Sequence, residues 1–161
     1  MLSRLLLILL VLSLLPAAAH AAVPEGADYT ETFIPTPDGE ELHVDILRPA
    51  GLTDADKTPV IAIVSPYLGH AGDGERAPSS RFNDLFEGMK VFERGYSVVM
   101  VDLRGSGGSS GCLDILGPGE QTDIKTAIEW AAGVPWSTGR VGMYGKSYDG
   151  NTGVVGAALR P

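Results

Sequence analysis

The chain has 161 residues, of which 44% are hydrophobic, 20% charged and 7% aromatic, a composition typical of globular proteins rather than of disordered, collagen-like or coiled-coil chains. The 12 Lys and Arg residues are outnumbered by 20 Asp and Glu residues, and the resulting net charge of −8 argues against nucleic acid as a partner. The single cysteine, Cys112, excludes an intrachain disulfide and a multi-cysteine metal cluster.

The N-terminal segment has the three parts of an export signal. Arg4 supplies a positive charge, an apolar run covers residues 5–15, and small residues follow Pro16 as far as Ala21. The apolar run is shorter than the roughly 20 residues that span a bilayer, which favours a cleaved signal over a membrane anchor. Cleavage sites after Ala19 and after Ala21 both fit, and we prefer the second.

We therefore predict a signal peptide over residues 1–21 and a single domain over residues 22–161. The mature chain is expected in the periplasm or outside the cell, without membrane attachment.

Apolar patterning and turn residues predict the elements of this domain. They are, in chain order, a hairpin of residues 29–34 and 41–47, buried strands over 60–64 and 96–101, helices over 82–94 and 120–132, a short strand over 141–144 and a helix after Ser147. A hairpin followed by alternating strands and helices predicts an α/β fold with helices on both faces of the sheet.

The turn between the last strand and the last helix holds the candidate nucleophile. Ser147 lies on this turn, with Gly145 before it and Gly150 after it. A serine on such a turn projects above the sheet at a helix N-terminus, where backbone N–H groups favour a developing oxyanion. The second glycine comes one residue later than in the general G-x-S-x-G pattern, so this pattern alone leaves a plain Gly/Ser turn as an alternative.

Three segments together resemble one family. Residues 145–150 (GKSYDG) are similar to the nucleophile motif of Xaa-Pro dipeptidyl-peptidases, cocaine-esterase-like acyl esterases and α-amino-acid ester hydrolases. Residues 102–111 (DLRGSGGSSG) resemble the D-x-R-G-x-G-x-S-x-G segment of the family, and residues 65–67 (SPY) resemble its oxyanion-hole segment. The resemblance extends from about residue 29 to residue 158. It implies the N-terminal part of an α/β-hydrolase fold that stops after the nucleophile elbow.

The resemblance implies roles for three residues of this chain. Ser147 matches the nucleophile, the backbone N–H of Tyr148 matches one oxyanion donor, and the Tyr67 hydroxyl matches the other. A packing role at the edge of the core is the alternative for Tyr67. Asp102 and Arg104 are interpreted as a structural brace of their turn rather than as catalytic residues.

The catalytic triad is where the sequence departs from the family. The resemblance implies Ser, Asp and His in that order along the chain, but residues 148–161 contain no histidine and no acid except Asp149. The three histidines all precede the serine: His20, His43 and His70. His70 is interpreted as a solvated loop residue rather than a base. We therefore expect the chain to be the N-terminal piece of a larger hydrolase and to be inactive alone.

Other signals in the sequence are weaker. Arg140 occupies the position where a phosphate loop needs glycine, and Ser110 occupies the third glycine position of a dinucleotide fingerprint, which argues against nucleotide binding. Cys112 is interpreted as inert packing, Trp130 as core and Trp136 as packing the loop before the last strand. Since no group of His, Asp and Glu has metal-ligand spacing, no metal and no cofactor are expected.

Two classes of function fit the sequence. The first is an exported serine hydrolase that cleaves amide or ester bonds in peptides or small acyl substrates through an acyl-enzyme on Ser147. Lys146 in the motif looks more like the peptidases, which favours Xaa-Pro dipeptide release, with acyl ester hydrolysis as the alternative. The second class is a non-catalytic exported α/β domain or an inactive fragment.

Overall fold

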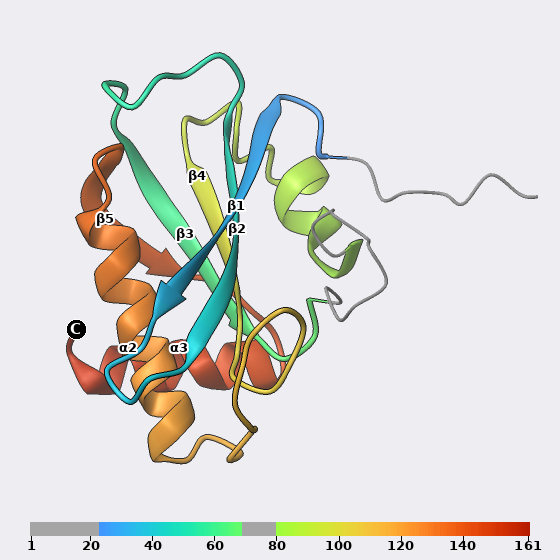
Figure 1. Cartoon of the computed structure of the whole chain (residues 1–161). Coiled ribbons are helices and arrows are strands. Elements are labelled where there is room, and N and C mark those ends of the chain that lie inside the picture. The colour runs from blue at the N-terminus through green and yellow to red at the C-terminus, as the bar shows by residue number, and fades with distance from the viewer. Residues whose placement is uncertain (1–22, 69–79) are drawn as a thin grey trace, which may run out of the picture.

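A five-stranded mixed sheet forms the centre of the computed structural model, which describes residues 23–68 and 80–161 (Figure 1). The strands are β1 (Ala27–Pro35), β2 (Glu41–Pro49), β3 (Thr58–Ser65), β4 (Ser97–Asp102) and β5 (Ser137–Met143). Their spatial order is β1-β2-β4-β3-β5, in which β2 pairs antiparallel with β1 and β4, while β3 pairs parallel with β4 and β5. The carboxyl ends of β3, β4 and β5 therefore meet at one edge of the sheet.

Both faces of the sheet are covered (Figure 1). On one face α2 (Pro118–Gly133) and α3 (Tyr148–Leu159) pack over a core that includes Val99 and Val101. On the other face a 3₁₀ turn, η1 (Ser80–Phe82), and a π-helical turn, η2 (Asp84–Gly88), pack over Val98 and Met100. Because successive residues of a strand point to opposite faces, both faces of β4 need apolar residues, and residues 98–101 supply them, the pattern that predicts a doubly buried strand.

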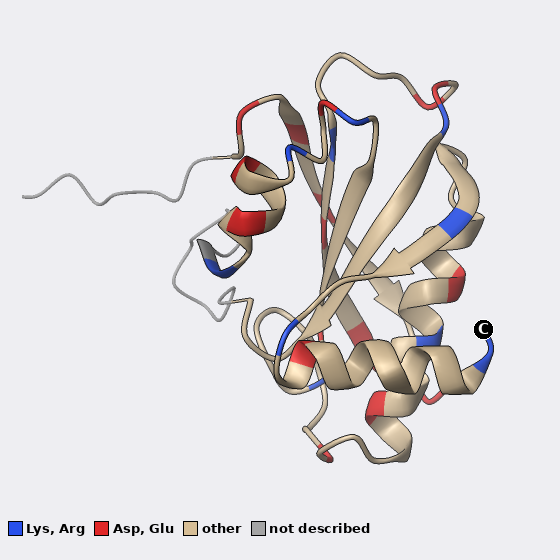
Figure 2. Ribbon diagram, turned by 180° about the vertical axis from the view of Figure 1, so that it is seen from behind, with Lys and Arg blue, Asp and Glu red and all other residues tan. Residues whose placement is uncertain are grey.

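The sheet carries few charges near its centre. Figure 2 shows most Lys, Arg, Asp and Glu residues on helices and loops, and among the strands β2 carries Glu41, Asp45 and Arg48. The sequence of β3 has no charged residue, and β4 has only Asp102. Within residues 23–68 and 80–161, no helix is both long enough and apolar enough to cross a membrane.

The predicted helix over residues 82–94 is wrong in type and length. Only η1 and η2 form there, and the chain after Met89 runs through irregular turns to β4. Lys90 has a φ of 51°, a left-handed conformation that a right-handed helix cannot continue through. The apolar residues of this segment are still buried, but they lie on short turns rather than on one helix. Phe86 and Phe92, for example, stack with ring centroids 5.7 Å apart.

The hairpin and the second helix are confirmed, and β5 is longer than predicted. Its parallel pairing with β3 begins at Ser137, opposite Thr58, before the predicted start at residue 141. The strand begins directly after Trp136, whose buried ring lies 5.0 Å from the Arg48 guanidinium carbon. Trp136 thus packs the segment leading into β5, as predicted.

The predicted brace of the turn forms at Asp102, whose Oδ2 accepts the Gly108 N–H at 3.0 Å, whereas Arg104 braces other elements than its own turn. Its guanidinium is buried and joins the hairpin turn to α2, with Nη1 donating to Asp38 Oδ2 at 2.8 Å and Nη2 donating to Asp123 Oδ1 at 2.7 Å. Hydrogen bonds from Arg104 and Thr36 lower the pKa of Asp38 to about 2. This brace ties the first hairpin to the face of the sheet that α2 covers.

Two expectations about packing need correction. Cys112 is exposed rather than packed. The contact at this position is made by its backbone, since a Cβ at Gly105 would lie 2.8 Å from Cys112 Cα. Trp130 is only partly buried and packs at the border of the core.

Candidate active site

Ser147 lies on a sharp turn between β5 and α3. Its φ is 59° and its ψ −125°, and it is exposed. These angles match the first central position of a type II′ turn, which normally requires glycine. A non-glycine residue held there is under backbone strain of the kind found at functional sites. The fold thus presents the serine to solvent at the N-terminus of a helix.

Close packing around the turn explains the unusual spacing of its glycines. A Cβ at Gly145 would lie 2.4 Å from Asp149 Cβ and 2.6 Å from the Asp149 carbonyl oxygen. A Cβ at Gly150 would meet its nearest atom, the Gly145 carbonyl oxygen, at 3.4 Å, an ordinary contact. The first glycine is therefore required for strand and helix to approach, whereas the position of the second is free to differ from G-x-S-x-G.

The rings of the two residues predicted to supply oxyanion donors lie side by side, and one of them, Tyr148, directly follows the serine. Tyr67 follows the end of β3, and its ring makes an edge-to-face contact with the ring of Tyr148, with centroids 6.1 Å apart. Tyr67 is 50% exposed, and its hydroxyl has no hydrogen-bond partner among the described residues. Tyr148 is the first residue of α3, so its backbone N–H has no acceptor within the helix. The structure thus brings the three predicted site residues together.

Asp149 links the elbow to the end of β3. This carboxylate is buried, accepts a hydrogen bond from Ser65 Oγ at 2.5 Å, and accepts another from Arg81 Nε at 2.9 Å. Arg81 also donates to the Lys146 carbonyl oxygen at 3.2 Å, and its guanidinium carbon lies 5.1 Å from the centroid of the Tyr67 ring. Sequence reasoning missed Arg81, since no motif singles out an isolated arginine after a loop.

The side chain of Tyr148 is fixed to α2. Its hydroxyl donates to Glu120 Oε2 at 2.5 Å, and the fully buried Glu120 carboxylate also accepts the N–H groups of Ile115 and Leu116. Burial, followed by the hydrogen bond to Glu120, raises the pKa of Tyr148 to about 12. The phenol therefore stays protonated at neutral pH and anchors the first turn of α3.

His43 is the one histidine in the part of the chain that the structure describes; His20 and His70 lie outside it. It is buried in β2, with Nδ1 3.2 Å from Asp102 Oδ2 and Nε2 3.3 Å from Glu31 Oε2. The hydrogen bond with Asp102 is the main cause that raises its pKa. Because β4 and β3 separate β2 from β5, three strand spacings of about 4.8 Å place His43 out of hydrogen-bond reach of Ser147.

One group of described residues could hold a cation. The ligand atoms of Glu31, His43 and Asp45 all lie within 4.8 Å of one another. Spacing along the chain did not reveal this group, because the antiparallel register places Glu31 opposite Asp45 and thereby joins two strands. The Tyr29 hydroxyl already donates to Asp45 Oδ1 at 2.8 Å within the same group.

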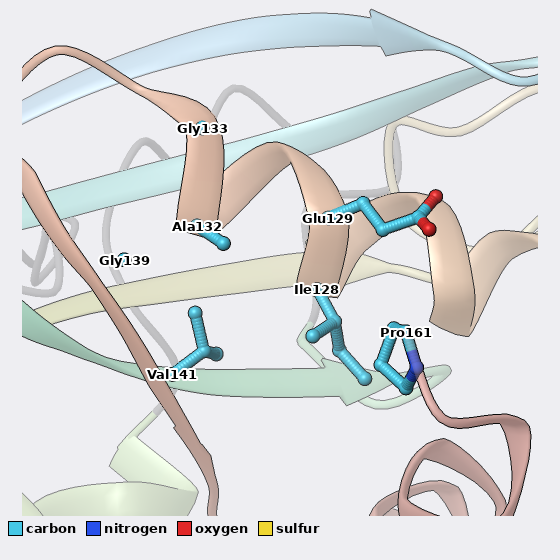
Figure 3. Close-up of a pocket in the computed structure, with 7 residues that line it drawn as sticks. All are labelled: Ile128, Glu129, Ala132, Gly133, Gly139, Val141 and Pro161. Carbon is cyan, nitrogen blue, oxygen red and sulfur yellow. The ribbon is translucent and has the colours of Figure 1, made fainter.

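A groove lies between α2 and β5 (Figure 3). It is lined by Ile128, Glu129, Ala132, Gly133, Gly139, Val141 and Pro161. The lining contains none of the three predicted site residues, and its one ionisable side chain is Glu129. The groove therefore brings no catalytic group to Ser147.

Comparison with known proteins identifies the family of the chain. The sequence matches the X-Pro dipeptidyl-peptidase (S15) family over residues 38–161. It is 31% identical over 182 aligned residues to a putative Xaa-Pro dipeptidyl-peptidase of Streptomyces avermitilis, covering 88% of this chain and 27% of that protein. It is 30% identical over 124 residues to the cocaine esterase of a Rhodococcus species, covering 76% of this chain and 20% of the esterase.

Solved structures agree with the sequence matches. An α-amino acid ester hydrolase superposes with a TM-score of 0.60 at 32% identity, covering 92% of this chain and 26% of that one. A CocE/NonD family hydrolase from Staphylococcus aureus superposes with a TM-score of 0.66 at 29% identity, covering 81% of this chain and 25% of that one. This chain spans about a quarter of the length of these relatives. It belongs to the X-Pro dipeptidyl-peptidase (S15) family and has the architecture of an α/β-hydrolase.

Proposed function

We propose that the protein is an exported serine hydrolase that cleaves acyl bonds through an acyl-enzyme on Ser147, with Xaa-Pro dipeptide release as its principal reaction. The observation that carries this proposal is the strained, exposed Ser147 at the N-terminus of α3, directly before Tyr148, whose ring contacts the ring of Tyr67. Membership of the S15 family supports the hydrolase class.

In the proposed reaction Ser147 Oγ attacks the carbonyl carbon of the scissile bond and passes its proton to a general base. The carbonyl oxygen becomes an oxyanion, to which the Tyr148 backbone N–H and the Tyr67 O–H donate hydrogen bonds. The tetrahedral intermediate then expels the amine or alcohol, which takes the proton from the base. Water hydrolyses the acyl-enzyme by the same steps and restores the serine.

We propose that the base and its acidic partner come from a segment that follows Pro161, in the order Asp then His. Asp149 is committed to Ser65 and Arg81, and His43 is committed to Asp102, so neither is available to Ser147. The chain by itself is accordingly proposed to be inactive, with residues 1–21 as a cleaved signal and residues 22–161 as the N-terminal part of the catalytic domain.

Substrate class is the finer part of the proposal. The dipeptidyl-peptidase relative and Lys146 in the motif support Xaa-Pro substrates, whereas the cocaine esterase relative supports acyl esters as the second candidate. The test is kcat/KM of a full-length form, which includes the segment after Pro161, on Xaa-Pro p-nitroanilides and on p-nitrophenyl esters. Ser147→Ala serves as the inactive control.

We expect turnover of the Xaa-Pro amides, and its loss in Ser147→Ala. Faster turnover of esters, with the amides untouched, would replace the peptidase by the acyl esterase. A folded full-length protein that turns over neither substrate would leave the non-catalytic α/β domain as the better description.

A further inference from the structure

Arg81 contacts three separate parts of the candidate site. Its Nε donates to Asp149 on α3, its Nη2 donates to the carbonyl oxygen of Lys146 on the elbow, and its guanidinium lies over the ring of Tyr67 after β3. These contacts join the elbow to the segment that carries the second oxyanion donor. None of the roles implied by the family motifs belongs to Arg81.

Tyr67 needs such a support. Its side chain is 50% exposed, and among the described residues its hydroxyl makes no hydrogen bond that would fix the ring. The edge of the Tyr148 ring contacts it, at a centroid distance of 6.1 Å, and the Arg81 guanidinium lies 5.1 Å from the same ring. A half-exposed phenol without these contacts would sample several rotamers, and only one of them can point its O–H at the oxyanion.

Arg81 is itself held in place. Asp149 is fully buried and also receives the Ser65 hydroxyl, so its position is fixed from β3 and from α3. The guanidinium is planar, so the same group can donate in its plane to Asp149 and Lys146 while presenting its face to an aromatic ring. A lysine has one compact ammonium in place of this plane, so it cannot make both kinds of contact.

We propose that Arg81 is a positioning residue of the oxyanion hole, which holds the Tyr67 phenol in register with the Ser147 elbow through Asp149. This inference rests on the proposed function, since it assigns Arg81 a part in the reaction of Ser147. Arg81 acts through Tyr67 and does not touch the substrate. Because small misplacements of a catalytic group cost about 10²-fold in rate, loss of Arg81 should slow the chemical step.

A double-mutant cycle tests the proposal in the full-length protein, with Arg81→Gln, Tyr67→Phe and the combined variant. We expect Arg81→Gln to lower kcat by about 10–100-fold with KM changed less than threefold, the range for a misplaced donor. The combined variant should be no slower than Tyr67→Phe alone, since Arg81 has no hydroxyl left to position. Arg94→Gln, which removes an exposed arginine, is the matched control and should keep the wild-type kcat.

Multiplying effects in the combined variant, or an unchanged kcat in Arg81→Gln, would overturn the inference. If near-ultraviolet circular dichroism shows that Arg81→Gln does not fold, Arg81→Lys replaces it in the cycle. Lysine keeps the positive charge beside Asp149, but kcat should still fall because the contact that positions Tyr67 is lost. Ser147→Ala separates the two proposals. Turnover that survives Ser147→Ala refutes the proposed function, whereas turnover abolished there, with multiplying Arg81 and Tyr67 effects, refutes only the role of Arg81.

Discussion

Replacing Ser147 by glycine should stabilise the protein while it removes the nucleophile. The φ of 59° and ψ of −125° suit glycine, and a side chain held in such a region costs about 1–3 kcal/mol. Part of this gain in stability is offset, because glycine has more conformational freedom in the unfolded chain and its ordering costs about 0.5–1 kcal/mol more. Ser147 makes no side-chain capping hydrogen bond that would be lost. The net expectation is a gain of about 1 kcal/mol, or about 3 °C in Tm.

Ser147→Ala is the matched control for this measurement. Alanine also lacks the hydroxyl, but it keeps a Cβ and therefore keeps the strain, so its Tm should stay within about 1 °C of the wild type. Thermal and urea unfolding of the three proteins give the comparison. A glycine variant no more stable than the alanine variant would refute the reasoning that the elbow stores strain.

Four further outcomes are expected. Tyr67→Phe should lower the kcat of the full-length protein by about 10²–10³-fold with little loss of stability, as for the removal of one oxyanion donor; an unchanged kcat would make Tyr67 a packing residue. The pKa of His43 is raised above its ordinary value of 6.5 chiefly by the hydrogen bond with Asp102, so its protonated form should stabilise the fold fully below pH 6.5 and lose this contribution as the pH rises through the raised pKa. Urea unfolding of wild type and His43→Gln from pH 5.5 to 8.5 measures this, and a constant difference between them would contradict it. Residues 22–161 produced alone should aggregate or stay partly open and hydrolyse neither Xaa-Pro amides nor aryl esters, since β5 has β3 as its single described partner; a cooperative fold with Ser147-dependent turnover would show otherwise. Sequencing of the mature N-terminus after expression in the native host should begin at Ala22, and a protein that retains Met1 would exclude a cleaved signal.

The order of the elements was predictable because it depends on local patterns. The doubly buried strands β3 and β4 contain continuous apolar runs, and the two strands of the hairpin are joined by the Pro37-Asp38-Gly39 turn. The helix predicted over residues 82–94 failed for a tertiary reason. Its apolar residues have helical spacing, but a left-handed Lys90 breaks the chain into turns that still bury Phe86 and Phe92.

The site was predictable where a motif fixes it. The turn around Ser147 and the placement of Tyr67 after β3 follow from the sequence and its family resemblance. Contacts between distant segments were not predictable, because strand register and loop packing create them. Arg81 reaches Asp149 across 68 positions of the chain, and Glu31 meets Asp45 only through the register of β1 with β2.

The central claim is that Ser147 is an activated nucleophile in the full-length protein. The most direct measurement is reaction of that protein with a fluorophosphonate probe, followed by mass spectrometry of its peptides. The account predicts one adduct, on Ser147, that is formed by the wild type, is absent in Ser147→Ala and is lost on unfolding before the probe is added. A folded wild-type protein without an adduct, or labelling that persists undiminished in Ser147→Ala, would contradict it.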